Sequence, residues 1–448
     1  MSTVPMISAL ILLLVGGYFT VKFKMFYILH PKRTLSLVSK DGITQMLLSL
    51  GGTVGVGNIS GVAVAIMMGG SGAVLWMWVG AFFAMALKYA EITLGMIERK
   101  GAKRYIAAAL GSIASWIFAA LLIIDCIMMG AAIQANAISE AMCEAFGISP
   151  LLCGILLCVL TSAVFTFKLD LFRLSGYIVP LMSVGYALAA LFVIALNITA
   201  VPKVIADIFH SAFTFDSAVG GVFGFLFTPA FKQGIIKGLF SNEAGCGTAP
   251  LAHAEAKETV PARQGLFGVF EVAVDTVVMC TLTALVILLT LGDENLGASG
   301  GVAVCVTAFS KIFGNFAAYV LCIFVFLFAF SAIVSFGYYG IKSISLMTAK
   351  ESAVNIFLTV YFAAVFVGCT SAPMMIWTLA DYVICIMLII NTTAVFIMRK
   401  KVLSEHARLY TQIGKYSQSA SKTRDFSCGR IKNEIPMSQI DIKDGFTR

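Results

Sequence analysis

Long apolar runs alternate with short polar connections along almost the whole chain of 448 residues. A membrane-crossing helix needs about 20 mostly apolar residues, and the pattern predicts about eleven such spans. They fall near residues 7–28, 41–69, 73–97, 112–142, 150–167, 176–197, 217–256, 264–291, 302–345, 352–369 and 374–398. Two of these runs are too long for one simple helix, and each is expected to include a short extra helix, such as Val302–Phe313. The pattern therefore predicts an all-α integral membrane protein.

The second run is interrupted by glycines, in the segment GGTVGVGN at residues 51–58. Glycine weakens a helix, and an unpaired backbone amide in hydrocarbon costs several kcal/mol. A broken membrane helix is therefore tolerated mainly where its freed N–H and C=O groups face a cavity or a ligand. The segment predicts a binding site.

A similar segment recurs about 190 residues later, where GCGTAPLAHA at 245–254 resembles GVGNISGVAVA at 55–65. The two copies are five predicted spans apart. Because five is odd, the second copy enters the membrane from the opposite side, which is typical of an inverted repeat. Chance similarity between two Gly/Ala-rich helices is the alternative. We expect an extra helix and a basic loop over 1–40, repeats over 41–215 and 216–398, and a basic cytoplasmic tail over 399–448.

Composition and charge place the chain in a membrane. Hydrophobic residues make up 59% of it and charged residues only 12%, about half the usual charged fraction. The net charge is +8, but Lys and Arg gather in alternate connections. The positive-inside rule then predicts a multi-pass cell-membrane protein with its N-terminus outside and its C-terminus in the cytoplasm. No basic domain exists outside the tail, which argues against nucleic acid as a partner.

The first glycine break offers groups for both ends of a zwitterion. Half-helix N-termini favour anions, and half-helix C-termini with unwound carbonyls favour cations. Gly55, Val56 and Gly57 would supply N–H groups, and Val54 a carbonyl. The Asn58 amide could serve either end, or it could make a helix–helix hydrogen bond. Two such breaks fit a small amino acid, or an anion with Na⁺, better than a sugar.

Each of the other polar residues within the apolar runs has more than one interpretation. Gln134 faces a cavity or packs, and Ser331 offers oxygen to a cation or bonds its own helix. Trp377 belongs to an interface belt, packs, or covers a substrate cavity. Around the second break lie Asn242, Glu243 and Thr248, where Glu243 contacts substrate or pairs with a backbone amide or with Lys237.

Charged groups within the spans suggest ion pairs rather than catalysis. Glu271 and Asp275 share a helix face at i,i+4, which indicates a polar network or a proton site, while Lys88 and Glu91 are spaced to pair with each other. His253 and Glu255 do not form an HExxH motif. Because no nucleophile–base pair or metal constellation is visible, we expect neither an enzyme nor a cofactor.

The motifs resemble those of the alanine or glycine:cation symporters, also called sodium:alanine symporters or amino acid carrier proteins. GVGNISGVA at 55–63 is similar to their GTGNIAGVA, and GLFSNEAGCGTAPLAH at 238–253 resembles GLFSNEAGxGSAPIAH. The second match is the more specific one. The resemblance covers about Ile7 to Met398. It implies the leucine-transporter type of fold, with a five-plus-five inverted repeat and one extra helix in front.

The resemblance also implies a site. Substrate contacts would come from Gly55, Val56, Gly57, Asn58, Gln134, Asn242, Gly245, Gly247, Thr248 and Trp377. A Na⁺ site would use Gly51, Val54 and Ser331. This chain departs from the family at Val56 and Ala332, where the usual residue is Thr, and each change removes a hydroxyl. Losing the second hydroxyl leaves the coupling ion open, because Na⁺ needs several oxygen ligands.

The sequence as a whole predicts a symporter that imports a small neutral amino acid, alanine or glycine, with Na⁺ through the lipid bilayer. One alternative is proton coupling with Glu243, Glu271 or Asp275 as the carrier. A channel or a transport-dead amino-acid sensor is another. The chirality of the substrate, the stoichiometry of transport and the oligomeric state stay open. A monomer is compatible with the predicted site.

Overall fold

The computed structural model describes residues 3–37, 42–99, 101–213, 228–293, 300–370, 373–409 and 411. The chain divides into two compact units, Met1–Glu405 and His406–Arg448, and every helix that bears on the site belongs to the first. Its helices in the first half are α1 (Thr3–Lys22), α2 (Phe26–Leu29), α3 (Pro31–Leu37), α4 (Ile43–Thr53), η2 (Val56–Asn58), α5 (Ser60–Gly69), α6 (Ala73–Glu98), α7 (Gly101–Leu110), α8 (Ser112–Asp125), η3 (Cys126–Ile133), α9 (Gln134–Phe146), α10 (Pro150–Thr166), α11 (Leu171–Leu196), η4 (Ile198–Ala200) and α12 (Val201–Ala212). The second half has α13 (Pro229–Asn242), α14 (Ala249–His253), α15 (Pro261–Val272), η7 (Ala273–Cys280), α16 (Thr281–Thr290), α17 (Gly301–Phe313), α18 (Phe316–Ser345), α19 (Glu351–Thr370) and α20 (Pro373–Ile397).

The all-α membrane architecture is confirmed. Within the described ranges, eight helical stretches are long and apolar enough to cross a bilayer. The other three predicted spans are α10, with 17 residues, and the two broken helices α4–α5 and α13–α14. Both breaks therefore lie where the glycine-rich segments predict them.

Several predicted span limits are wrong, each for a local reason. The span 7–28 ends too late, because α1 stops at Lys22 and the next turn has a positive φ of 52° at Lys24 and 50° at Met25. The span 176–197 begins too late, because Asp170 accepts a hydrogen bond from the Arg173 N–H at 3.1 Å and starts α11 at Leu171. Of the span 217–256, residues 217–227 lie outside the described residues.

Two short helices lie beside the long ones. The predicted extra helix of 302–345 is confirmed as α17, which ends at Phe313 and is followed by Gly314 with a positive φ of 58°. In addition, α12 occupies the connection between the sixth and seventh predicted spans, where the apolar pattern predicts no span. The Trp76 indole N–H of α6 donates to the Ala212 carbonyl at 3.2 Å and attaches α12 to the bundle.

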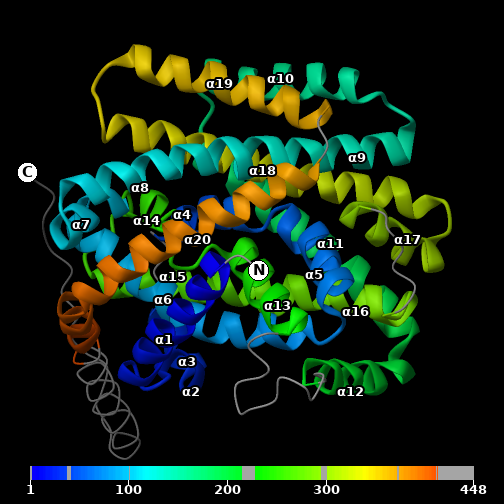
Figure 1. Cartoon of the computed structure of the whole chain (residues 1–448), viewed down its shortest axis with the longest axis horizontal. Helices are drawn as coiled ribbons and strands as arrows, with labels where there is room; N and C mark the ends of the chain where they lie inside the picture. Colours follow the sequence, from blue (N-terminus) through cyan, green and yellow to red (C-terminus); the bar gives the residue numbers. More distant parts are fainter. Residues whose placement is uncertain are drawn as a thin grey trace, which may run out of the picture. The chain divides into compact units, whose positions relative to one another are not determined.

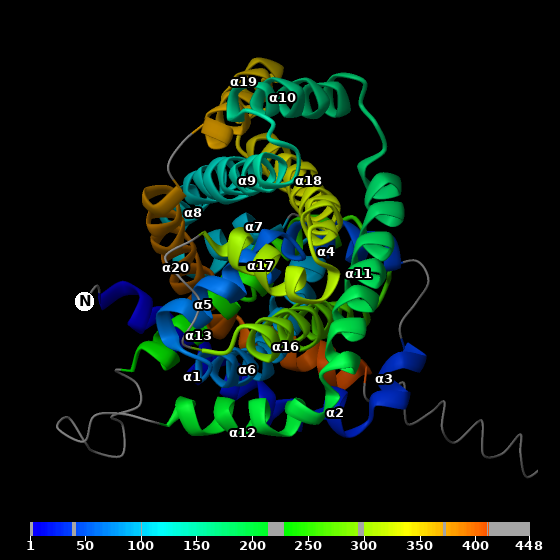
Figure 2. The same ribbon diagram turned by 90° about the vertical axis from the view of Figure 1, so that its right-hand side faces the viewer.

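The helices pack so that the first break lies in the interior of the first unit. In both views α10 and α19 lie side by side at the top, with α9 and α18 beneath them (Figures 1 and 2). The segment η2 contacts α13, η7 and α18, and α6 packs on α13 and α15. The outer helix α10 exposes Leu151, Leu152, Ile155, Leu156 and Val159, a surface suited to lipid.

Candidate functional site

The first break is a tight, buried turn between α4 and α5. Gly55 has an extended backbone, with φ −118° and ψ −154°, and its N–H donates to the Thr53 carbonyl at 2.8 Å. The Asn58 N–H returns to the Gly55 carbonyl at 3.2 Å. This turn directs the Val56 N–H away from the helix and toward the side chain of Gln134 in α9.

Gln134 is the residue that meets this turn. Its Oε1 accepts the Val56 N–H at 3.1 Å, while its Nε2 donates to the Met129 carbonyl at 3.2 Å. A Cβ added at Gly55 would lie 3.1 Å from Gln134 Oε1 and 3.3 Å from the Ala332 Cβ. A neutral amide oxygen thus accepts this N–H.

Asn58 ties the start of α5 to two other helices. Its Nδ2 donates to Asp275 Oδ1 at 2.8 Å, to the Asp275 carbonyl at 2.9 Å and to Ser241 Oγ at 3.0 Å. The side chain is fully buried, and its Oδ1 has no hydrogen-bond partner among the described residues. The Asn58 nitrogen therefore makes the helix–helix hydrogen bonds of the alternative interpretation, and its oxygen is available to a hydrogen-bond donor or a cation.

The predicted cation site joins the C-terminal end of α4, with Gly51 and Val54, to Ser331 of α18. A Cβ added at Gly51 would lie 2.6 Å from Ser331 Oγ, and Val54 directly follows the helix as its C-cap. Ser331 is 1% exposed, and its hydroxyl has no hydrogen-bond partner among the described residues. Buried hydroxyls nearly always have a partner. This one lies where the carbonyl end of α4 favours positive charge.

The second break is built around a carboxylate of the protein itself. Gly245 and Gly247 have left-handed φ values of 81° and 78°. Their N–H groups donate to Glu91 Oε1 at 3.1 Å and to Glu91 Oε2 at 3.0 Å. Asn391 of α20 donates to the same carboxylate at 2.9 Å and to the Gly245 carbonyl at 2.8 Å. These two N–H groups are therefore already occupied in this conformation.

Lys88 does not pair with Glu91 as the spacing suggests. Its Nζ lies 3.2 Å from Glu271 Oε2 and donates to the Asn242 carbonyl at 2.7 Å. Glu271 is also 2.6 Å from His253 Nε2 and accepts from Ser49 Oγ at 2.9 Å. This buried network joins α4, α6, α13, α14 and α15, so the polar network predicted for Glu271 is present.

The pairing of Glu243 with Lys237 is wrong as well. Lys237 Nζ lies 2.9 Å from Asp381 Oδ2, whereas Glu243 Oε2 accepts from Thr248 Oγ1 at 2.6 Å. Glu243 adopts a left-handed φ of 51° and is 1% exposed. Thr248 thus stabilises the conformation of the second break through this hydrogen bond.

The other predicted site residues lie around these two breaks. Asn242 donates to Thr276 Oγ1 at 3.1 Å and accepts from the Ala244 N–H at 3.0 Å. Half-buried Trp377 stacks on Phe240, with ring centroids 4.7 Å apart. The Phe240 ring in turn lies 3.3 Å from the position of a Cβ at Gly57. The Phe240 ring therefore packs between Trp377 and the first break.

The sequence pattern does not predict a role for three residues of this region. Ser241 bridges Asn58 and Asp275, accepting from Asn58 at 3.0 Å and donating to Asp275 Oδ2 at 2.7 Å. Asn391 holds the second break, as described above. Asp125, at the end of α8, is 1% exposed. Asp125 and Asn391 each interrupt an apolar run, which is a signal that could have found them.

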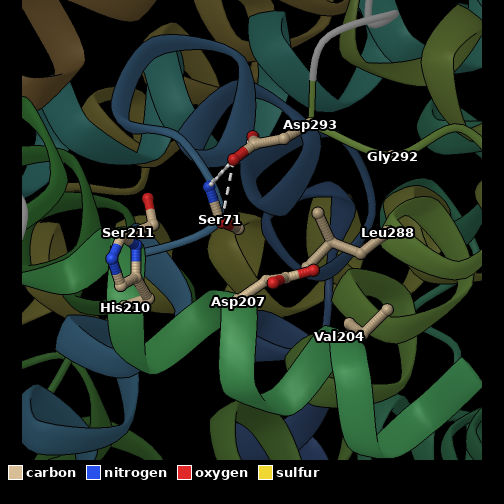
Figure 3. A pocket seen from close by; sticks show the side chains of 8 residues that line it. All are labelled: Ser71, Val204, Asp207, His210, Ser211, Leu288, Gly292 and Asp293. Carbon is tan, nitrogen blue, oxygen red and sulfur yellow. Dashed lines mark hydrogen bonds between the residues drawn. The ribbon is translucent and has the colours of Figure 1, made fainter.

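A separate cavity of about 240 Å³ lies at the other end of α5, beside α12 (Figure 3). Asp293 closes one side of it, because the Ser71 hydroxyl donates to Asp293 Oδ2 at 2.8 Å and the Ser71 N–H to the same carboxylate at 3.0 Å. No predicted site residue lines it. The lining residues are Ser71, Val204, Asp207, His210, Ser211, Leu288, Gly292 and Asp293.

Comparisons with known proteins agree with the architecture. The model of the sodium:alanine symporter family matches residues 2–424. The "Probable sodium/glutamine symporter GlnT" of Bacillus subtilis is 34% identical over 88% of this chain and 86% of its own. The sodium/alanine symporter AgcS of Methanococcus maripaludis is 32% identical over 80% of this chain and 82% of its own. The crystal structure of MhsT with L-phenylalanine superposes with a TM-score of 0.62 at 15% identity, covering 82% of this chain and 92% of that one.

Proposed function

Because the chain belongs to the sodium:alanine symporter family and has the leucine-transporter type of fold, we propose that it imports alanine or glycine together with Na⁺. The family makes it a multi-pass membrane transporter rather than an enzyme, with amino acids and Na⁺ as the family's substrates. The choice of a small neutral amino acid, the direction of transport and Na⁺ as the ion coupled in this chain are the proposal.

The first break supports an amino acid as the substrate. The substrate carboxylate would replace Gln134 Oε1 at the Val56 N–H, where the two now lie 3.1 Å apart, with Gly55, Gly57 and Asn58 beside it. A charged acceptor makes a stronger hydrogen bond than a neutral amide. Two side chains pack closely against the break. The Ala332 Cβ lies 3.3 Å from the Cβ position of Gly55, and the Phe240 ring lies 3.3 Å from that of Gly57. This crowding favours a small side chain, with Trp377 behind Phe240.

The observation that carries the Na⁺ proposal is the unpartnered hydroxyl of Ser331 against Gly51. A Na⁺ ion there would take the Ser331 oxygen and carbonyls of the α4 end near Gly51 and Val54. Such an arrangement joins α4 to α18 when the ion is bound. Because Ala332 supplies no hydroxyl, we expect weaker Na⁺ binding than in a relative with Thr at that position.

The second break would flank the substrate from the opposite side. Asn242, Gly245, Gly247 and Thr248 would keep this break in shape around Glu91 and so position it beside the substrate. Na⁺ stabilises the outward-open state, and joint occupancy permits the change of access. The protein would lie in the cell membrane with its N-terminus outside and its C-terminus inside.

Uptake of labelled L-alanine into proteoliposomes tests the proposal. We expect accumulation under an imposed inward Na⁺ gradient, and competition by glycine exceeding competition by D-alanine or by glutamine, the amino acid in the name of GlnT. Uptake that follows an imposed H⁺ gradient and ignores Na⁺ would replace the proposal with proton coupling. Saturable binding without counterflow would identify an amino-acid sensor instead.

A further inference from the structure

Two side chains of α6 reach the two ends of the second break. Glu91 accepts the Gly245 and Gly247 N–H groups at 3.1 and 3.0 Å. Lys88 reaches the other end, where its Nζ donates to the Asn242 carbonyl at 2.7 Å. Residues three apart lie on the same face of a helix. One face of α6 therefore supplies a carboxylate to the amide end of the break and an ammonium to its carbonyl end.

The carbonyl end is a position that favours positive charge. Asn242 is the last residue of α13, and the final carbonyls of a helix lack intrahelical donors and carry partial negative charge. The Glu271 carboxylate adds a full negative charge, with its Oε2 at 3.2 Å from Lys88 Nζ. Its other oxygen contacts His253. Without the ammonium, a buried carboxylate and a helix carbonyl would share this end, which is costly where water is excluded.

The packing of α6 on α15 holds the Lys88 side chain in place. A Cβ added at Gly268 of α15 would lie 3.1 Å from Lys88 Cγ, so the two helices approach closely at this side chain. Lys88 and its partner Glu271 are both 0% exposed. The ammonium therefore cannot move to solvent unless α6 and α15 separate.

The first break differs at its carbonyl end, where α4 meets a neutral side chain. The Ser331 hydroxyl lies against Gly51 and has no hydrogen-bond partner among the described residues. A cation at this end has to come from solution. At the second break, a lysine of the protein itself already supplies the positive charge.

We propose that the Lys88 ammonium is a tethered cation, which fills the carbonyl end of the second break so that this end takes no Na⁺ from solution. An ammonium carries the same charge as Na⁺, and its three N–H donors suit carbonyl and carboxylate oxygens. Because the charge is covalently attached, it is present at every Na⁺ concentration. One consequence rests on the proposed function, namely that Na⁺ is coupled to transport at the first break and not at the carbonyl end of the second.

Removal of the ammonium tests the proposal, because it should create a site for a cation from solution. We expect the full chain with Lys88→Ala, purified in choline chloride, to unfold more than about 5 °C below the unaltered chain, since Glu271 loses its cation. Purification in NaCl or in methylammonium chloride, at the same ionic strength, should recover about half of this loss or more. Both cations are smaller than choline and fit the space that the lysine side chain leaves.

Two further variants control for a general effect of salt. Lys237→Ala removes the ammonium of another buried ion pair, with Asp381, and should gain no more from Na⁺ or methylammonium than the unaltered chain does. The double variant Lys88→Ala/Glu271→Gln should lose the added response, because the carboxylate that would bind the cation is then neutral. Thermal unfolding in the same three salts measures all of these variants.

The remaining outcomes would overturn the tethered cation. If Lys88→Ala responds to Na⁺ and methylammonium no more than the unaltered chain, or folds in none of the three salts, Lys88 is a structural ion-pair partner only. The same holds if the double variant keeps the added response. Alanine uptake by the unaltered chain separates the two proposals, because a cation response in Lys88→Ala without uptake overturns the transport proposal alone, and uptake without that response overturns the tethered cation alone.

Discussion

The two helix breaks are similar in sequence but differ in what occupies them. The turn at Gly55–Asn58 meets a neutral side chain, with Gln134 Oε1 at 3.1 Å from the Val56 N–H. The break at Gly245–Thr248 encloses the Glu91 carboxylate, which accepts two backbone N–H groups at 3.0 and 3.1 Å. A neutral acceptor can be displaced by a charged ligand more easily than an internal carboxylate can. The first break is therefore suited to exchange a ligand, and the second to hold its shape.

The largest expected effect comes from Gly245→Ala, at the second break. The added Cβ would lie 2.6 Å from Leu87 Cδ2 and 2.8 Å from Thr392 Oγ1, at a φ of 81°. Strain and overpacking together should lower the free energy of unfolding by about 3 kcal/mol or more. Thermal unfolding of the purified protein measures it. The control is Gly61→Ala in α5, where a Cβ meets nothing within 4 Å. Equal loss in both variants would contradict the assigned role of the second break.

Glu91→Gln should have the next largest effect. The amide keeps only one carbonyl oxygen for the two N–H groups of Gly245 and Gly247, so one buried donor loses its acceptor. Such a donor costs about 2 kcal/mol of stability. The same unfolding measurement applies, with Glu351→Gln on the exposed start of α19 as the control. A stable variant with impaired substrate affinity would instead place Glu91 at the substrate.

Ser331→Ala should act on the ion rather than on stability. We expect the Na⁺ concentration for half-maximal uptake to rise about tenfold, equivalent to ~1.4 kcal/mol, and Ala332→Thr to lower it. The matched control is Ser335→Ala, one turn along α18, whose hydroxyl already donates to the Leu48 carbonyl at 2.9 Å. If both serine variants shift the Na⁺ dependence equally, the cation site lies elsewhere.

Val56→Thr should have the smallest effect. It restores the hydroxyl of the family motif, but Val56 would contact the substrate through its backbone N–H. The half-saturating alanine concentration should change less than about threefold, which is below ~0.7 kcal/mol. Alanine uptake at saturating Na⁺ measures it, and a tenfold gain would show that the first break binds substrate through side chains as well.

The sequence predicts the positions of both breaks because glycines in an apolar run act locally on the helix. It does not predict which groups meet there, since those contacts cross between helices. Lys88 illustrates this limit, because Glu91 lies three residues away in the chain but Glu271 is its partner in space at 3.2 Å. The carboxylate inside the second break comes from α6, about 150 residues earlier. Only the packing of α6 on α13 and α15 brings these residues together.

In the two π-helical segments, the loss of a single residue would have a specific effect on helix geometry. A π segment contains more residues per turn than an α-helix, commonly one extra, and each here leads into a long α-helix: η3 into α9 and η7 into α16. Losing one residue from either segment would restore an α-helix while keeping the flanking helices in place. Loss of a residue from η7 would also turn Asp275 toward a different neighbour. A one-residue gap at 126–133 or 273–280 in a relative would therefore mark a change in this local geometry, which a comparison of substitutions alone would not reveal.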